Sequence, residues 1–193
     1  MKKIIRIGFL ILTTFSCKAQ IVPVEQVIDT YDNVEEGVTT YIKDVNNVLD
    51  DYVGIWKGTQ DNREYTFIIT ERTIVFDEEE NINADVLLMR HLIIDSTTFE
   101  IIEDATAISD EDVPSEGALF KLNSSGGLTY MFYYIGVDED KVECGQSGDV
   151  FITLKNNNTQ MYLILMPSYS TGNCTTGLAE QVLPTEGILL TKQ

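Results

Sequence analysis

The chain has 193 residues, 44% of them hydrophobic, and its 31 acidic and 13 basic residues give a formal charge of −18. This length fits one globular domain. The negative charge excludes nucleic acid as a partner, because the chain would repel a phosphate backbone, and it favours basic partners.

The first 19 residues have the three-part pattern of an export signal. A basic start (Lys2, Lys3, Arg6) is followed by an apolar run over residues 7–12 and then by small and polar residues. The apolar run is shorter than the roughly 20 residues that cross a bilayer. We therefore expect an exported protein, located in the periplasm or outer membrane if it is a lipoprotein and secreted otherwise.

Cys17 lies where a bacterial lipoprotein carries its lipidated cysteine, directly after the small residue Ser16. We predict lipidation at Cys17, so that the protein would contact a membrane only through this anchor. Ordinary cleavage after Ala19 is the alternative, because the residues before it also fit the small-residue rule for signal cleavage. The sequence does not indicate the membrane leaflet.

Two further cysteines follow in the exported part of the chain. If Cys17 carries lipid, Cys144 and Cys174 remain as an even pair. In an oxidising compartment, a disulfide between them would close a loop of about 30 residues and contribute roughly 3 to 4 kcal/mol. Two buried free thiols are the alternative.

Residues 20–38 are mixed polar and acidic, with Pro23 and Gly37, and we predict that they form a flexible tether. Residues 39–193 are then a single domain, since no repeat or linker divides them. At the start of this domain, apolar residues from Tyr41 to Tyr52 recur at the spacing of one helical face. This pattern predicts a short N-terminal amphipathic helix.

Ten short segments then have the composition of strands, being rich in β-branched and aromatic residues and separated by turn formers such as Asp95-Ser96 and Asn156 to Asn158. They cover residues 52–58, 63–70, 72–77, 85–95, 98–104, 117–123, 128–136, 149–155, 160–167 and 187–192. We place a further turn at Glu71-Arg72, between the second and third segments. Without helical patterns between them, these segments exclude a parallel βαβ sheet and predict an all-β, antiparallel meander.

Such a sheet must close or stack. The last segment could pair with the first and close a β-barrel of about 8–10 strands, and a two-sheet sandwich is the alternative. The segments around residues 87–94, 129–136 and 161–166 are apolar on both faces, so we expect part of the outer face to be covered as well.

The single tryptophan, Trp56, follows Gly54 and Ile55 in the first predicted strand. A short helix that leads into a first strand with Gly-x-Trp resembles the arrangement in lipocalins, whose barrels hold a small ligand. The resemblance implies a lipocalin-like barrel that Trp56 closes at one end. The interior of a barrel of this size is either filled or just large enough for one small ligand.

A second resemblance covers nearly the whole chain. It rests on SCKAQ at the signal, YIKDVNNVLDDYVGIWKGT, LLMRHLIIDS, ECGQSGDVFI, NCTTGLAEQVLP and the closing LLTKQ. Together these stretches resemble a family of small secreted or lipid-anchored proteins of flavobacteria and their relatives, a domain of unknown function. The resemblance implies a location and a fold but no activity. It also implies that Cys144 and Cys174 are paired.

Catalytic patterns are weak. His91 is the single histidine, and no nucleophile or zinc-binding motif accompanies it, so we expect a structural or surface role. Glu103 and Asp104, with Glu100, would be the paired carboxylates of a glycosidase, but carboxylates are too abundant here for their proximity to carry weight. The acidic clusters lack the spacing of a calcium-binding loop and are expected to be solvated, at residues 77–80, 110–112 and 138–140. We therefore predict no enzyme, no metal site and no cofactor.

A binding role is the stronger prediction. Tyr130, Phe132 and Tyr134 share one face of a predicted strand, which should line the barrel. With Trp56 they are the predicted ligand-binding residues for a small apolar molecule. The alternative is a filled barrel, a non-catalytic structural or protein-interaction module that meets a basic protein partner. The sequence does not indicate the ligand, the partner or the oligomeric state.

Overall fold

The computed structural model describes residues 19–26, 38–77, 81–113, 117–121, 128–136, 142, 144–168 and 179–193. They form strands β1 (Ala19–Pro23), β2 (Thr39–Lys43), β3 (Gly54–Gln60), β4 (Arg63–Asp77), β5 (Ile82–Asp95), β6 (Ile101–Asp104), β7 (Gly117–Lys121), β8 (Leu128–Ile135), β9 (Ser147–Lys155), β10 (Gln160–Pro167) and β11 (Ile188–Lys192), with one 3-10 helix, η2 (Val24–Gln26). In this part of the chain, no helix is long and apolar enough to cross a membrane.

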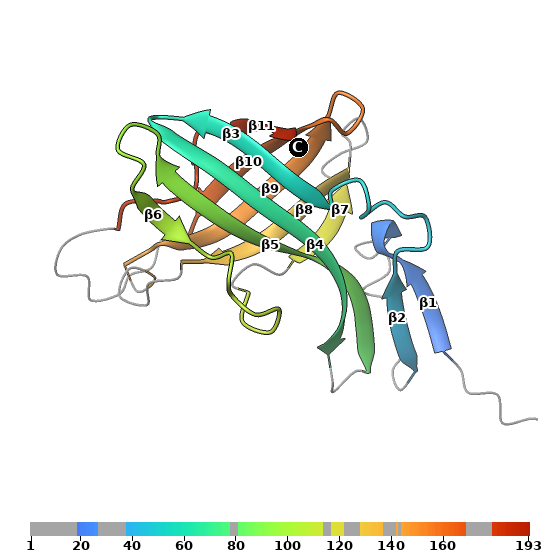
Figure 1. The fold of residues 1–193 in the computed structure, drawn as a ribbon. Helices are drawn as coiled ribbons and strands as arrows, with labels where there is room; N and C mark the ends of the chain where they lie inside the picture. The colour runs from blue at the N-terminus through green and yellow to red at the C-terminus, as the bar shows by residue number, and fades with distance from the viewer. Residues whose placement is uncertain are drawn as a thin grey trace, which may run out of the picture.

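All eleven strands belong to one sheet, in the order β1-β2-β5-β4-β3-β11-β10-β9-β8-β7, with β6 beside β5. The sheet curls into a half-barrel in which β3 to β5 face β8 to β10 (Figure 1). The predicted pairing of the first and last barrel strands is confirmed, because β11 runs antiparallel to β3 with Lys192 opposite Trp56. The free ends of this strand order lie at β1 and β7, so the open seam is not between β3 and β11.

Strands β3 to β11 correspond to the ten segments predicted from the sequence, because residues 63–70 and 72–77 form the single strand β4. The turn predicted between them, at Glu71-Arg72, is wrong. Glu71 and Arg72 lie opposite Leu87 and Val86 in an unbroken antiparallel ladder with β5. Glu71 is exposed and Arg72 is partly exposed, so these polar side chains do not interrupt the pairing of the main chain in this long hairpin.

The amphipathic helix predicted over residues 41–52 is also wrong. Its first residues belong to β2, which runs parallel to β5, and the remainder is a series of turns. The Asp44 carboxylate accepts hydrogen bonds from the amides of Val48 (2.9 Å) and Leu49 (2.8 Å), and Asn47 has a left-handed backbone (φ 54°). A side chain that bonds to nearby amides in this way gives the backbone an alternative to a helix.

Part of the segment predicted to be a tether takes part in the sheet. β1 runs parallel to β2, with Ile21 opposite Tyr41. Val22 and Val24 are 4% and 3% exposed. The strands predicted to be antiparallel thus gain two parallel neighbours at one edge.

The seam between the two halves of the half-barrel is bridged by tyrosine hydroxyls. No ladder of the described strands joins β7 or β8 to β5 or β6. Instead, the Tyr130 hydroxyl of β8 accepts a hydrogen bond from the Leu87 amide of β5 (2.7 Å), and the Tyr52 hydroxyl donates to the Leu128 carbonyl (2.8 Å). These bonds hold the two halves together where main-chain pairing is missing.

The interior is filled by hydrophobic side chains from β3 to β5 and from β8 to β11. Trp56 is fully buried, and its indole N–H donates to the Tyr52 carbonyl (2.8 Å). The segment over residues 179–187 crosses the half-barrel beside Arg63, the first residue of β4. We call this segment the strap. Its Val182 and Leu183 are 6% and 2% exposed and belong to the core.

Candidate functional site

The four residues predicted to bind a ligand lie together on the inner face of the half-barrel. Trp56, Phe132 and Tyr134 are 0% exposed and Tyr130 is 1% exposed. The rings of Tyr130 and Phe132 are 4.7 Å apart, and the polar groups of Trp56, Tyr130 and Tyr134 are hydrogen-bonded within the protein. In this conformation the four side chains are packed as core residues.

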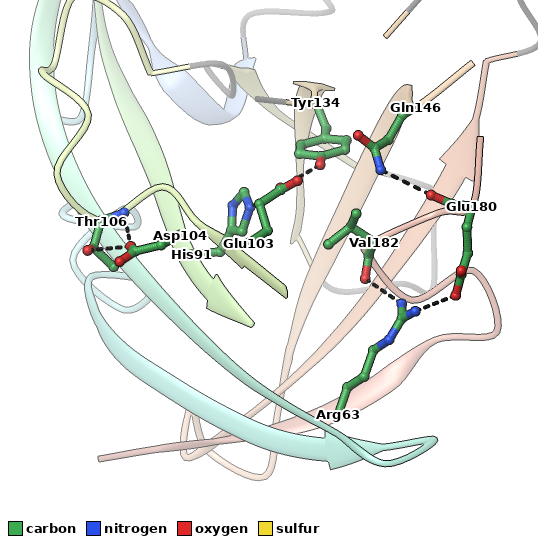
Figure 2. Close-up of polar contacts among 9 residues, drawn as sticks. All are labelled: Arg63, His91, Glu103, Asp104, Thr106, Tyr134, Gln146, Glu180 and Val182. Carbon is green, nitrogen blue, oxygen red and sulfur yellow. Dashed lines mark hydrogen bonds and ion pairs between the residues drawn. The ribbon is translucent and has the colours of Figure 1, made fainter. Parts of the chain in front are cut away.

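A buried polar cluster lies beside them (Figure 2). His91 of β5 and Glu103 of β6 are paired at 2.5 Å between Nε2 and Oε1, and their side chains are 0% and 3% exposed. The Tyr134 hydroxyl donates to the same carboxylate oxygen at 2.8 Å. We call these three side chains the seam cluster, because they join β5 and β6 to β8.

The geometry of the seam cluster places a proton between His91 and Glu103. His91 Nε2 faces the Glu103 carboxylate, whereas Nδ1 is buried and has no hydrogen-bond partner in the described part of the chain. Burial, and then the adjacent Glu103 carboxylate, raise the pKa of Tyr134 above its ordinary value. The hydroxyl therefore stays protonated and keeps donating to Glu103.

The seam cluster is not a pair of glycosidase carboxylates. Glu103 points inward, whereas its neighbour Asp104 is exposed and accepts hydrogen bonds from the amide (2.9 Å) and hydroxyl (2.6 Å) of Thr106. Successive residues of a strand point to opposite faces, so these two carboxylates cannot share a substrate. His91 is buried, which agrees with a structural histidine.

A polar cleft of about 290 Å³ opens where the strap crosses the start of β4. Its walls come from the end of β3, the β3–β4 turn, the first residues of β4 and the strap, namely Gln60, Asp61, Arg63, Tyr65, Glu180, Gln181, Leu183, Pro184, Thr185 and Glu186. The turn that begins this wall is Asp61-Asn62, with positive φ at both residues (50° and 60°). Two such residues suit the tight turn of a hairpin.

Arg63 holds the strap in place, as Figure 2 shows. Its guanidinium donates to the Gln181 carbonyl (3.0 Å) and the Val182 carbonyl (3.4 Å), and it forms an ion pair with Glu180. The Arg63 side chain is 22% exposed, whereas that of Glu180 is 82% exposed. Most of the hydrogen-bonding capacity of Arg63 is therefore committed to the strap and not to a ligand.

Hydrogen bonds to the β8–β9 connection hold the other side of the strap. Gln146 Nε2 donates to the Glu180 carbonyl (3.0 Å), and Gln181 Nε2 donates to the Gly145 carbonyl (2.8 Å). Gln181 Oε1 is buried and has no hydrogen-bond partner in the described part of the chain. The amide of Gln181 is thus fixed in orientation, and its buried oxygen is an acceptor that no described residue uses.

No pattern in the sequence indicates this cleft. Arg63 and Glu180 are 117 residues apart, and nothing in the pattern around either of them indicates the other. A detectable local signal is the Asp61-Asn62 turn, which marks a hairpin but not its neighbour. The predicted site residues lie inside the fold. The cleft is lined by two residues of a predicted strand, Arg63 and Tyr65, and otherwise by residues between the predicted strands.

Several predicted features lie outside the described residues: Cys17, Cys174 and the acidic clusters at 78–80 and 138–140. Cys144 is described, and its carbonyl accepts a hydrogen bond from the Ala179 amide at the start of the strap (2.9 Å). Because its predicted partner is not described, the disulfide remains a prediction. Among the described residues, no group of three or more His, Cys, Asp or Glu side chains could hold a metal ion.

Residues 1–115 match a family that is described as a family of unknown function (DUF6705). The match includes the strands from β1 to β6, and therefore Arg63, His91 and Glu103, but not the strap. No curated protein and no solved structure matches the chain.

Proposed function

The chain belongs to a family of unknown function, DUF6705, and from its site we propose a non-catalytic binding protein of the cell envelope. In this proposal the filled half-barrel is the scaffold, and the cleft beside the strap is the ligand site. The observation that carries the proposal is the cleft itself, which is large enough for a small molecule and is lined by Gln181, a residue whose buried Oε1 has no hydrogen-bond partner in the described part of the chain. A buried acceptor without a partner is costly, and a ligand that donates a hydrogen bond would relieve this cost.

The charges of the cleft indicate the kind of ligand. Asp61, Glu180 and Glu186 contribute carboxylates to its lining, against the single guanidinium of Arg63. These groups attract hydrogen-bond donors and positive charge, and they oppose a ligand that carries a carboxylate. Tyr65 provides a buried aromatic wall. We therefore propose a small, donor-rich ligand that is neutral or cationic, such as an amine or an amino sugar.

Export and the lipocalin-like character belong to the same proposal. Their support is the signal pattern of residues 1–19, the nine-strand meander, and the burial of Trp56 in the first strand of that meander. If Cys17 is lipidated, β1 begins two residues after the anchor, at Ala19. The lipid would then hold the β1 edge of the sheet close to the membrane.

The test is native mass spectrometry of the protein purified from its own envelope, with extraction and identification of any molecule that remains bound. Spermidine and glucosamine then serve as probes in titration calorimetry. We expect Gln181→Leu to weaken probe binding at least about tenfold, which corresponds to about 1.4 kcal/mol. The matched control is Gln193→Leu, at the exposed end of the chain, which should bind as the wild type does.

Other outcomes would place the ligand site in the interior or exclude a ligand. If the extracted molecule is apolar, and if Trp56→Ala weakens its binding by more than it lowers stability, the ligand lies among the aromatic residues as the sequence predicted. A chain that purifies without any bound molecule and binds neither probe would contradict a ligand-binding role. These outcomes separate the cleft, the aromatic interior and the absence of a ligand.

A protein-interaction module is the second candidate, and the β5–β6 turn favours it. The Asp95 carboxylate accepts hydrogen bonds from the amides of Thr97 (2.7 Å) and Thr98 (2.8 Å), and these bonds fix the turn. Phe99 follows with a left-handed backbone (φ 62°) and a side chain that is 74% exposed. A bulky residue in this conformation is strained, and such strain tends to persist at functional sites.

The surroundings of Phe99 define the partner. Asp95, Glu100 and Asp104 are acidic residues of the same turn and of β6, so a partner would present a basic rim around an apolar pocket. Photo-crosslinking from position 99 in intact cells, followed by binding of the captured basic protein at low and high salt, tests this candidate. This candidate is supported if Phe99→Ala abolishes binding, Ile21→Ala keeps it and salt weakens it. Binding that is independent of the salt concentration would contradict it.

A further inference from the structure

The outer face of β8 to β11 is apolar, although it belongs to a chain with a formal charge of −18. Its side chains alternate with the buried ones of the inner face. Five of these outward residues are large, hydrophobic and 37–55% exposed: Tyr133, Ile135, Tyr162, Met166 and Leu189. Met131, Phe151 and Ile164 lie between them and are partly exposed. We call these eight residues the outer apolar face.

The strand register makes this face continuous. Tyr162 lies directly opposite Leu189 of β11. Met131, Phe151 and Ile164 form one row across β8, β9 and β10. Neighbouring strands are about 4.8 Å apart, so side chains in such rows touch. The eight residues are therefore a single patch and not scattered exposed positions.

The patch is also flat at Tyr162. The tyrosine side chain lies over Gly187, where an added Cβ would stand 2.0 Å from the hydroxyl oxygen. Gly187 has a φ of 81°, a backbone conformation that glycine adopts easily. This glycine lets the Tyr162 ring lie along the sheet next to Leu189, which leaves a smooth surface for a flat partner.

Charge decides which partner fits. Between the row of Ser147 and the row of Thr153, Asp149 is the one charged residue among the outward positions of β8, β9 and β10. Two copies of so acidic a chain repel each other across most of their surfaces. On this face they can approach with few opposed carboxylates. A basic partner, by contrast, finds its complement on the acidic turns and not here.

The size of the patch is sufficient for a second copy. Eight side chains of this exposure offer on the order of 600 Å² of apolar surface, the upper range for the largest patch on an ordinary monomer. Two copies would bury about 1,200 Å² in total, which is the lower limit of specific interfaces. A two-fold axis uses the same patch on both copies, so the interface needs no second surface.

We propose that two copies of this chain associate through their outer apolar faces into a homodimer. The eight residues of the interface are different from those that line the cleft and from those of the β5–β6 turn. Burial of apolar surface drives the association and the negative charge of the chain opposes it. Salt should therefore strengthen the dimer, whereas it would weaken the binding of a basic partner.

The test is sedimentation equilibrium of the full exported chain, carrying Cys17→Ser to remove the predicted lipidation site. We expect a monomer–dimer equilibrium that tightens between about 0.05 and about 0.5 M salt. Leu189→Glu should raise the dissociation constant at least about tenfold, because the substitution buries an unpaired carboxylate in an apolar interface. Tyr162→Thr is a second variant that keeps the strand propensity of the position.

Ile55→Glu is the matched control, since Ile55 is 43% exposed on β3 and lies outside the patch. It should dimerise like the unsubstituted chain. A monomer at about 100 µM in high salt would overturn the proposal, because interfaces of this size hold at micromolar concentrations. The proposal would also be overturned if Leu189→Glu dimerised as strongly as the unsubstituted chain. A monomer that floats with neutral phosphatidylcholine vesicles would overturn it too, because the face would then be assigned to a lipid surface.

Discussion

The two halves of the curled sheet are alike on the inside and unlike on the outside. The inner faces of β3 to β5 and of β8 to β11 are both buried, with Trp56, Phe67 and Phe132 at 0% exposure. The outer face of the first half carries polar groups such as the Lys57–Glu64 pair (3.8 Å), and Arg90 donates there to the Ile108 carbonyl (2.9 Å). The outer face of the second half is the outer apolar face.

The inner faces must be alike, because both halves bury one core. Folding places no such demand on the outer faces, and our dimer proposal assigns the difference between them to assembly. The expectation that outer apolar positions would be covered holds for β5, where Leu88 is 2% exposed. On β8 to β11 five large apolar residues remain exposed, and the proposed dimer would cover them. The following predictions test this division between a stabilising interior and a functional surface.

The largest effect on stability should come from truncating a large core side chain in either half. Trp56→Ala and Phe132→Ala should each lower the free energy of unfolding by about 3 to 5 kcal/mol, because each leaves a cavity in a filled interior. Urea unfolding measures both. A loss below about 1 kcal/mol in one half only would show that the two inner faces are not one core.

The predicted disulfide would stabilise the second half alone. If the chain is exported as proposed, we expect an intact mass lower by two hydrogens, and we expect reduction to lower the free energy of unfolding by roughly 3 to 4 kcal/mol. The control is the double variant Cys144→Ser, Cys174→Ser, whose stability should not respond to a reductant. Alkylation of both thiols in the unfolded, unreduced protein would contradict the pairing.

The seam cluster should join the two halves. Glu103→Leu leaves the His91 N–H and the Tyr134 hydroxyl without an acceptor inside the protein, which should cost about 2 to 4 kcal/mol. A double-mutant cycle with Tyr134→Phe isolates the hydrogen bond across the seam. Additive losses from the two substitutions would mean that Glu103 does not couple β6 to β8.

Alkaline pH should weaken the same contacts. Burial first, and then nearby carboxylates, raise the pKa of Tyr52 and Tyr134 in the folded protein. Below the ordinary value of 10.0 these tyrosines are protonated in both states and their contribution is complete. Above it the unfolded chain releases its protons first, so stability should fall by about 1.4 kcal/mol per pH unit for each such tyrosine. Unfolding curves between about pH 9 and pH 11 measure this loss of stability per pH unit. It should be smaller for Tyr134→Phe, because one of the two tyrosines no longer titrates.

The smallest effects on stability should come from the outer faces. Ile55→Thr and Leu189→Thr should each change the free energy of unfolding by less than about 0.5 kcal/mol, because both residues are exposed on strands. Thermal unfolding of the dilute, monomeric protein measures this. A loss of more than about 2 kcal/mol for Leu189→Thr would mean that the outer apolar face is required for folding.

Local patterns in the sequence were sufficient for the strands of the meander. Period-two alternation and turn residues are local properties, so the segments of β3 to β11 and the Asn156 to Asn158 turn could be predicted. Local patterns failed for the helix predicted over residues 41–52. There the Asp44 carboxylate accepts hydrogen bonds from two amides, although the apolar spacing indicated a helix. They also failed at Glu71, which continues a strand because its partner strand β5 continues opposite it.

The sequence by itself determined the all-β class, the pairing of the last barrel strand with the first, and the burial of Trp56, Tyr130, Phe132 and Tyr134. Only the tertiary structure decided where the half-barrel stays open, which side chains bridge the seam, and where the cleft lies. Arg63 meets Glu180 across 117 residues, and such contacts depend on strand register and on the path of the strap. The physical reason is that the alternation of apolar and polar residues indicates which face of a strand is buried. The residues that contact either face come from distant parts of the chain, and no local pattern predicts them.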